Sequence, residues 1–152
     1  MSIAVKRLTK ELTSLQSEKN KIPGIIIDNP SDIMTWNATI LGPSDSPYEN
    51  GIFKMLIRFN DEYPVKAPSV KCLTPMFHPN FYRDGKICVD ILQAEWTPSQ
   101  NVRTILLSIM SLLTDPNPSS PANRDAAILY NDKTEYDKKV RQFVEENKDK
   151  II

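Results

Sequence analysis

The amino-terminal stretch carries the clearest helical pattern in the chain. Charged residues alternate with apolar residues that recur at three- and four-residue steps: Val5, Leu8, Leu12 and Leu15. This spacing predicts an amphipathic helix, because residues three and four positions apart lie on one helix face. Ser2 stands where a capping residue is expected, and Pro23-Gly24 ends any regular structure before it.

Four later stretches are rich in β-branched, aromatic and apolar residues and predict strands, at residues 25–28, 33–41, 52–59 and 69–73. In the third stretch, Lys54 and Arg58 alternate with apolar residues, which predicts one buried face made of Phe53, Met55, Ile57 and Phe59. The connection from Gly42 to Gly51 is longer than the tightest hairpin turns. The sequence therefore predicts an antiparallel meander of four strands.

The pattern changes at residues 75–98, where prolines interrupt the chain and no strong period survives. A long irregular segment inside a compact domain is usually functional. Helical spacing returns after Asn101, and further helices are predicted at residues 122–130, with Ser120 as cap, and after Asp132. The last helix should direct four residues inward: Tyr136, Val140, Phe143 and Val144. A helix, then strands, then helices indicates an α+β fold.

Composition narrows the function classes. The 152 residues suit one domain over residues 1–152, and 19 basic residues balance 19 acidic ones. Zero net charge argues against direct nucleic-acid binding, and no apolar run approaches the ~18 residues of a membrane span. We expect a monomer of the cytoplasm or nucleus with two reduced cysteines. A single histidine excludes multi-histidine metal sites, so we expect no metal, and the four glycines form no phosphate loop.

The irregular segment contains the candidate chemistry, which is His78-Pro79-Asn80, then Cys88, then Trp96. A lone cysteine between Ile87 and Val89 is more often a small buried apolar residue than a nucleophile. Its position in an irregular segment favours a functional role, so both interpretations stay open. A thiol hydrolase would need His78 as the base for Cys88. Cys72, within a predicted strand without activating neighbours, is interpreted as structural.

The motifs of this segment resemble those of the ubiquitin-conjugating enzymes, the E2 family. The resemblance is carried by rare residue types at fixed separations: Tyr63-Pro64, Met76-Phe77-His78-Pro79-Asn80, Gly85-Lys86-Ile87-Cys88-Val89-Asp90-Ile91-Leu92 and Trp96-Thr97-Pro98. It extends over almost the whole chain, including Gly42-Pro43, Pro47-Tyr48 and Asp115-Pro116-Asn117-Pro118. Trp36-Asn37-Ala38 and Ser119-Ser120-Pro121-Ala122-Asn123 are most similar to the branch associated with DNA repair and histone modification.

The resemblance implies the ubiquitin-conjugating-enzyme fold, with an amino-terminal helix, a four-stranded meander, an irregular active-site segment and carboxy-terminal helices. Cys88 would accept ubiquitin from an activating enzyme (E1) as a thioester and pass it to substrate lysines. A thiolate suits this exchange, because it is both a strong nucleophile and a good leaving group. No cofactor is implied, since the activating enzyme would consume the ATP.

Asn80 would stabilise the oxyanion that forms during transfer, or would hold its loop through hydrogen bonds to the backbone. The resemblance makes His78 structural, and Asp90 and Trp96 are expected to support the loop. Tyr82 and Ser120 would line the groove for the incoming lysine. Many relatives carry Asp where Ser120 stands, so lysine transfer here is expected to depend more on a ligase.

The resemblance also implies partner surfaces. Lys6, Arg7 and Lys10 match the helix face that binds the activating enzyme, although a charge cluster can equally be a solvated face. Ligases (E3) would contact this helix end and four loop residues: Val65, Trp96, Pro98 and Ser99. Relatives that serve HECT ligases carry Phe where Val65 stands, so we expect RING-type ligases.

Three alternatives remain beside an active conjugating enzyme. One is an inactive E2-like adaptor, which is disfavoured because such variants lack the cysteine. Another is conjugation of a different ubiquitin-like modifier, disfavoured by the modest basic content and the absence of an amino-terminal extension. The third is the thiol hydrolase, disfavoured by a single histidine that precedes a proline. The chain also lacks an extension after Ile152, so substrate choice is expected to come from a ligase.

Overall fold

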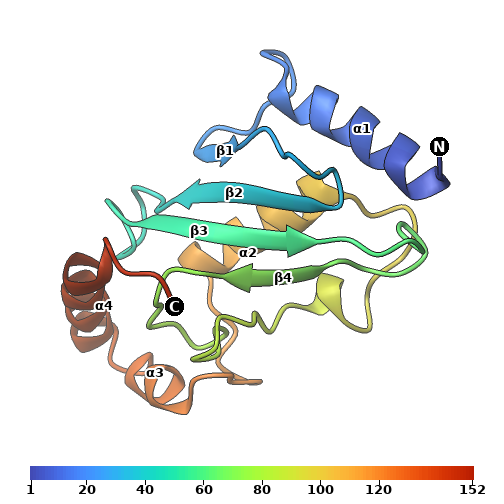
Figure 1. The fold of residues 1–152 in the computed structure, drawn as a ribbon. Coiled ribbons are helices and arrows are strands. Elements are labelled where there is room, and N and C mark those ends of the chain that lie inside the picture. The colour runs from blue at the N-terminus through green and yellow to red at the C-terminus, as the bar shows by residue number, and fades with distance from the viewer.

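The computed structural model describes residues 1–152 and contains four α-helices, four strands and one short 3-10 helix (Figure 1). In chain order these are α1 Ile3–Gln16, β1 Ile25–Ile27, β2 Thr35–Leu41, β3 Ile52–Arg58, β4 Ser69–Cys72, η1 Asp90–Leu92, α2 Val102–Thr114, α3 Arg124–Leu129 and α4 Lys133–Asn147. The predicted α+β order is confirmed. None of the helices combines the length and the apolar character needed to cross a bilayer.

The four strands form one antiparallel sheet in the order β1-β2-β3-β4, which confirms the predicted meander. Trp36 of β2 pairs with Ile57 of β3, and Ile57 pairs in turn with Val70 of β4. This register places large apolar residues side by side on one sheet face. The predicted inward set of the third strand is buried, whereas Lys54 and Arg58 are exposed.

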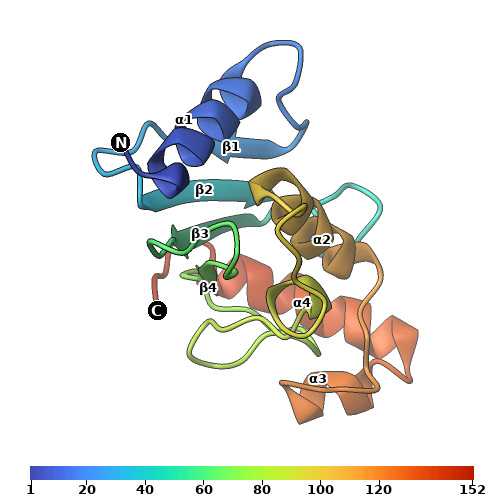
Figure 2. The ribbon, with the colours of Figure 1, turned by 90° about the vertical axis from the view of Figure 1, so that its right-hand side faces the viewer.

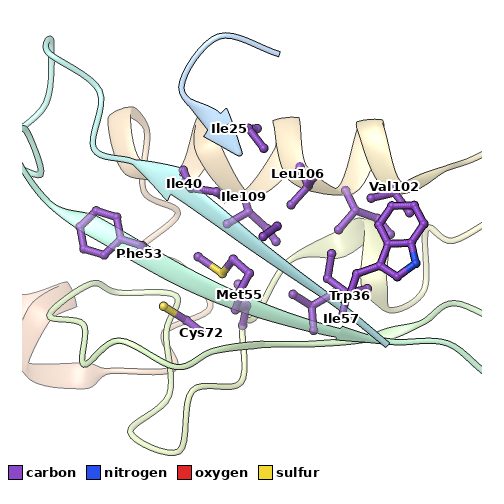
Figure 3. Close-up of a cluster of buried hydrophobic side chains, with 14 of the residues drawn as sticks. Ile25, Trp36, Ile40, Phe53, Met55, Ile57, Cys72, Val102, Leu106 and Ile109 are labelled. Carbon is purple, nitrogen blue, oxygen red and sulfur yellow. The ribbon is translucent and has the colours of Figure 1, made fainter. Parts of the chain in front are cut away.

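The core lies between that sheet face and α2. Figure 3 shows Trp36, Met55 and Ile57 directed toward Val102 and Ile109 of the helix. These five side chains belong to one cluster of 26 buried residues, which α1 and α4 extend. Helix α1 lies beside β1 and β2, while α3 lies at the opposite end of the molecule (Figures 1 and 2).

Local sequence signals set three of the four helix starts. Ser2 accepts a hydrogen bond from the Val5 N–H (3.1 Å), Asn101 forms a capping box with Thr104, and Asp132 accepts from the Glu135 N–H. Such caps satisfy backbone donors that the first helical turn leaves free.

The start predicted for the third helix is wrong. Ser120 does not cap it; Asn123 does, and α3 begins at Arg124, two residues later than expected. The reason is a distant acceptor, the carbonyl of Pro79, which accepts hydrogen bonds from the N–H groups of Ala122 (2.7 Å) and Asn123 (3.0 Å). These two groups are therefore bound outside the helix, and the chain runs through turns and bends until Asn123.

The segment expected to be irregular contains a small hairpin, here called the 80–88 hairpin. Phe81 and Ile87 form an antiparallel bridge, flanked by hydrogen bonds from Tyr82 N–H to Lys86 O and from Cys88 N–H to Asn80 O (2.8 Å each). Its turn contains Gly85 at φ 95°, where a Cβ would lie 2.4 Å from the carbonyl oxygen of Cys72. Only glycine fits this approach, and the Cys72 N–H donates to the Gly85 carbonyl (2.8 Å). The hairpin is thus docked against β4.

Candidate functional site

The 80–88 hairpin has one face in the core and a second face that is exposed only toward its turn. Phe81 and Ile87 are buried in the main cluster. Because side chains alternate along extended backbone, the neighbouring pairs belong to the other face: Asn80 with Cys88 and Tyr82 with Lys86. The register therefore places Cys88 opposite the buried Asn80, with the exposed Tyr82 and Lys86 next along the same face.

Cys88 is half-buried, and its Sγ lies 3.8 Å from the carbonyl oxygen of Ser120. The thiol opens onto a groove of about 520 Å³ between the loop after Cys88 and helix α2. The groove is lined by polar and acidic residues together with a few apolar ones, among them Asp90, Glu95, Thr104, Leu107, Ser108 and Asn117. Cys88 is therefore not sealed inside hydrocarbon.

Cys72 has the opposite environment. It is 1% exposed, its Sγ donates to the Thr74 carbonyl (3.3 Å), and burial raises the pKa of its thiol to about 12. A thiol held in the protonated form inside the core is unreactive. Of the two cysteines, only Cys88 is reachable by a macromolecular substrate.

Asn80 is 1% exposed and uses both ends of its amide on one distant residue. Its Nδ2 donates to the carbonyl of Asn117, and its Oδ1 accepts from the N–H of the same residue (2.8 Å each). This reciprocal pair ties the 115–121 loop to the hairpin, directly beside Cys88. Asn80 was expected either to stabilise an oxyanion or to hold its loop, and these two hydrogen bonds fit the second role. One Nδ2 hydrogen is left over, because an amide nitrogen has two.

His78 is completely buried, and both ring nitrogens are occupied. Its Nδ1 accepts from the Asn80 N–H (2.9 Å), so Nε2 carries the proton and donates to the Leu112 carbonyl of α2 (2.6 Å). Burial lowers the pKa of the imidazole to about 4, against the raising effect of the Leu112 carbonyl. Neither nitrogen can take a proton from Cys88, which argues against the thiol-hydrolase alternative.

The two residues expected to line a lysine groove both lie near Cys88. Tyr82 is 44% exposed and is cross-strand neighbour to Lys86. Ser120 is exposed, and it presents its backbone carbonyl rather than its hydroxyl to the sulfur. Asp90 begins η1, where its carbonyl accepts from the N–H groups of Gln93 and Glu95, while its carboxylate makes no hydrogen bond.

A second group of candidate residues lies around Arg7 of α1. Trp96 Nε1 donates to the Pro64 carbonyl (2.9 Å), and Arg7 donates to the carbonyls of Pro98 (3.2 Å) and Gln100 (2.8 Å). These bonds join three chain stretches far apart in sequence. Val65, which is 69% exposed, therefore lies on the same end of the molecule as the 96–100 loop.

Arg7 differs from the neighbouring cations with which it was grouped. Lys6 and Lys10 are exposed, as are Pro98 and Ser99, whereas Arg7 is partly buried and bonded within the chain. The predicted place of Arg7 on the partner-binding helix face stays a prediction, and the structure adds these internal bonds to it. Its guanidinium fastens α1 to the 96–100 loop.

Glu11 completes that fastening, and sequence reasoning missed its role. Its carboxylate accepts from Arg7 Nε (3.2 Å), from the Tyr63 hydroxyl (2.6 Å) and from the first N–H of α2 at Val102 (2.8 Å). Burial, followed by this hydrogen bond, raises the pKa of Tyr63. The four-residue step from Arg7 was the one available signal, since the other two partners lie far away in sequence.

Comparison with known proteins decides the family. A family model described as "Ubiquitin-conjugating enzyme" matches residues 7–144. The chain belongs to the ubiquitin-conjugating enzyme family. Proteins of this family, the E2 enzymes, work with ubiquitin, an activating enzyme, ligases and substrate proteins.

Curated relatives agree with this assignment. The chain is 48% identical to "Ubiquitin-conjugating enzyme E2 2" of Kluyveromyces lactis over 146 residues, which is 95% of this chain and 88% of the relative. It is 55% identical to the protein of the same name from Saccharomyces cerevisiae over 119 residues, 78% of this chain and 69% of the relative. The expected family, fold and conjugating activity are thereby confirmed, and the name E2 2 is consistent with the expected branch.

The buried His78 of this E2 makes stability depend on pH. Its pKa is about 4 when folded and near 6.5 when unfolded, so between these values the unfolded chain binds the additional proton. Stability is therefore present above pH 6.5 and lost as pH falls. We expect the free energy of unfolding to drop by about 2 kcal/mol from pH 7 to 5 through this group. Urea unfolding at several pH values measures the drop.

The control for that experiment is the imidazole itself. The chain has one histidine, so a proton NMR titration reports on His78 alone. An imidazole that titrates near pH 6.5 in the folded protein would contradict the prediction. In His78→Gln, this part of the pH dependence should be missing.

The Glu11 cluster should contribute measurably to stability. Glu11→Gln removes the charge that three donors share, and we expect it to lower the free energy of unfolding by about 1–3 kcal/mol. Glu18→Gln, in the turn after α1, is the matched control, because the ion pair of Glu18 with Lys21 is exposed and its loss should leave the free energy of unfolding nearly unchanged. Equal effects of the two substitutions in urea unfolding would show that Glu11 is not a joint between α1 and α2.

Proposed function

We propose that Cys88 is the residue that accepts ubiquitin from the activating enzyme, and that residues 1–152 act as one catalytic domain. The observation that carries this proposal is the half-buried thiol that opens onto a groove, while the other cysteine is sealed in the core. In the charging step, the Cys88 sulfur attacks the E1-bound thioester, and the thiol of the activating enzyme leaves. In the second step, a lysine amine attacks the new thioester and Cys88 leaves.

The groove suits an extended carboxy-terminal tail. It runs from Cys88 along α2, and its walls offer side-chain amides and hydroxyls from Gln100, Thr104, Ser108 and Asn117. An extended peptide carries unpaired N–H and C=O groups that need such partners. Bound in this way, the tail would hold its terminal carbonyl at the sulfur.

The lysine would arrive from the side of Tyr82 and Ser120. Neither residue is a carboxylate, so neither can accept a proton from the ammonium at neutral pH. Two roles for Asn80 are compatible with its contacts. It keeps the 117–120 backbone in place through Asn117, and its remaining Nδ2 hydrogen is available to a developing oxyanion.

The activating enzyme and a RING-type ligase are proposed to bind the surface formed by α1 and the loops around Val65 and Trp96. Lys6 and Lys10 supply exposed positive charge there. Val65, Pro98 and Ser99 form an exposed rim around Trp96, whose indole N–H is used on Pro64 and therefore supports the loop. Val65 is small, which favours RING-type over HECT ligases. A nuclear or cytoplasmic location and a monomeric state remain predictions from the sequence.

Charging with ubiquitin tests the central proposal. Incubation with activating enzyme, ATP and ubiquitin should give an adduct that a reducing agent cleaves. Cys88→Ser should give an adduct that resists reduction, because an oxygen ester replaces the thioester. Cys72→Ser is the matched control and should still give the reducible adduct. A reducible adduct that still forms in Cys88→Ser would refute the assignment of Cys88. Preferential charging with another ubiquitin-like modifier would show that the protein conjugates that modifier in place of ubiquitin.

Discharge kinetics separate the two roles of Asn80. If Asn80 stabilises the oxyanion, Asn80→Ala should charge nearly normally and transfer ubiquitin to free lysine about 10²-fold more slowly. If it only holds the loop, both steps should slow together, since Asn117 and Ser120 lie beside the sulfur that both steps use. Single-turnover assays of charging and discharge, followed on gels, measure the two rates.

A further inference from the structure

A hollow of about 980 Å³ lies between residues 75–83 and the helices α3 and α4, and it is here called the α3–α4 hollow. It is larger than the groove beside Cys88 and shares no lining residue with it. Part of its wall is apolar, formed by Met76, Phe77 and Phe143. Ile128 of α3 also lines it and is 60% exposed. A concave surface with exposed apolar side chains indicates a binding site.

Three cations line the α3–α4 hollow: Arg83, Arg124 and Lys139. All three are exposed, and the six ion pairs of the molecule include none of them. The Nζ of Lys139 lies 5.8 Å from the centre of the Phe77 ring, which places a positive charge directly over the apolar wall. Unpaired positive charge beside apolar surface suits a ligand that offers acidic and apolar side chains together.

Two carboxylates line the same hollow, at Asp125 and Asp132. The Asp132 carboxylate is already used as the cap of α4, where it accepts from the Glu135 N–H (3.3 Å). Asp125 lies in the first turn of α3, where a negative charge is favourable. Three positive charges thus meet two negative ones, one of which is bound to backbone, so the hollow keeps a positive surplus.

The hollow adjoins the proposed path of the acceptor lysine. Arg83 follows Tyr82 directly, and on the other side Ala122 stands two residues after Ser120. Consecutive Cα atoms are about 3.8 Å apart, so the hollow begins within about 4–8 Å of both residues of that path. The Pro79 carbonyl, which accepts from the Ala122 N–H, keeps the two sides together. An acceptor whose lysine passes Tyr82 and Ser120 would therefore lay its neighbouring residues in the hollow.

We propose that the α3–α4 hollow is a binding site for the acceptor protein, and that it selects lysines with acidic and apolar neighbours. This inference rests on the proposed function of Cys88. An extended peptide rises about 3.4 Å per residue, so residues about three to six positions from the lysine would reach about 10–20 Å into the hollow. Part of the choice of acceptor would then lie in this chain and not in a ligase alone.

Single-turnover transfer to peptides tests the proposal. The enzyme is charged with ubiquitin, the activating enzyme is stopped by removing ATP and magnesium, and a peptide with one lysine is added. The acidic peptide carries leucine and glutamates about three to six positions from the lysine on both sides, and the neutral peptide has glutamine for each glutamate. Transfer to the acidic peptide should be about fivefold faster or more, because three exposed ion pairs can form. High salt should shrink this advantage, since it screens exposed charges.

Charge reversal locates the effect. Arg83→Glu combined with Lys139→Glu should abolish the advantage and make a peptide with arginine for each glutamate the better acceptor. Lys138→Glu combined with Arg141→Glu is the matched control, because it makes the same change in net charge at exposed residues outside the hollow. This control should keep the advantage within about twofold. Charging with ubiquitin and discharge to free lysine should stay within about twofold in both variants, which shows that they are folded.

The outcomes separate this inference from the proposed function. Equal transfer to the acidic and neutral peptides, by an enzyme that charges and discharges to free lysine, would overturn the inference and leave the role of Cys88 intact. An equal loss in the matched control would show an effect of net charge and not a site. Binding of the acidic peptide without faster transfer, measured by fluorescence polarisation, would assign the hollow to another acidic partner and overturn the acceptor role. A chain that forms no thioester would overturn the proposed function and this inference with it.

Discussion

The structure around Cys88 depends on one buried hydrogen-bonded chain through His78 and Asn80. The imidazole bonds the Leu112 carbonyl near the end of α2 and the Asn80 backbone, and the Asn80 side chain bonds Asn117. Three segments that share no secondary structure are joined in this way. Because the imidazole is neutral and buried, its bonds do not compete with water, and each lost partner would leave an unsatisfied polar group. The position of the thiol depends on this chain together with the register of the 80–88 hairpin.

Helix α2 links this site to the surface around α1 that is proposed to bind partners. Its first N–H, at Val102, is bound by the Glu11 carboxylate of α1, its middle lines the groove, and its last turns accept from His78. A negative charge at a helix amino terminus is favourable, so Glu11 suits its position electrostatically. A protein that binds α1 therefore contacts an element one hydrogen bond away from the helix that forms the groove wall.

The sequence predicted best what is decided locally. The strands followed from alternation, and three helix starts followed from Ser2, Asn101 and Asp132, whose partners lie three residues away. Ser120 failed as a cap because the competing acceptor, Pro79, is about forty residues distant. Resemblance to a family supplied Cys88 and Asn80, which composition alone could not single out. Glu11 was missed, since its importance arises only when helix packing brings separate stretches together.

The docking of the 80–88 hairpin on β4 has a further effect on the sheet. β4 is one of the two edge strands of the order β1-β2-β3-β4, and an edge strand normally offers unpaired backbone groups to other molecules. Here the Cys72 N–H is taken by Gly85, and the Leu73 carbonyl by the N–H of Ile152. The segment that carries the thiol thus also shields the sheet margin from edge-to-edge aggregation, so damage to its turn would threaten solubility as well as catalysis.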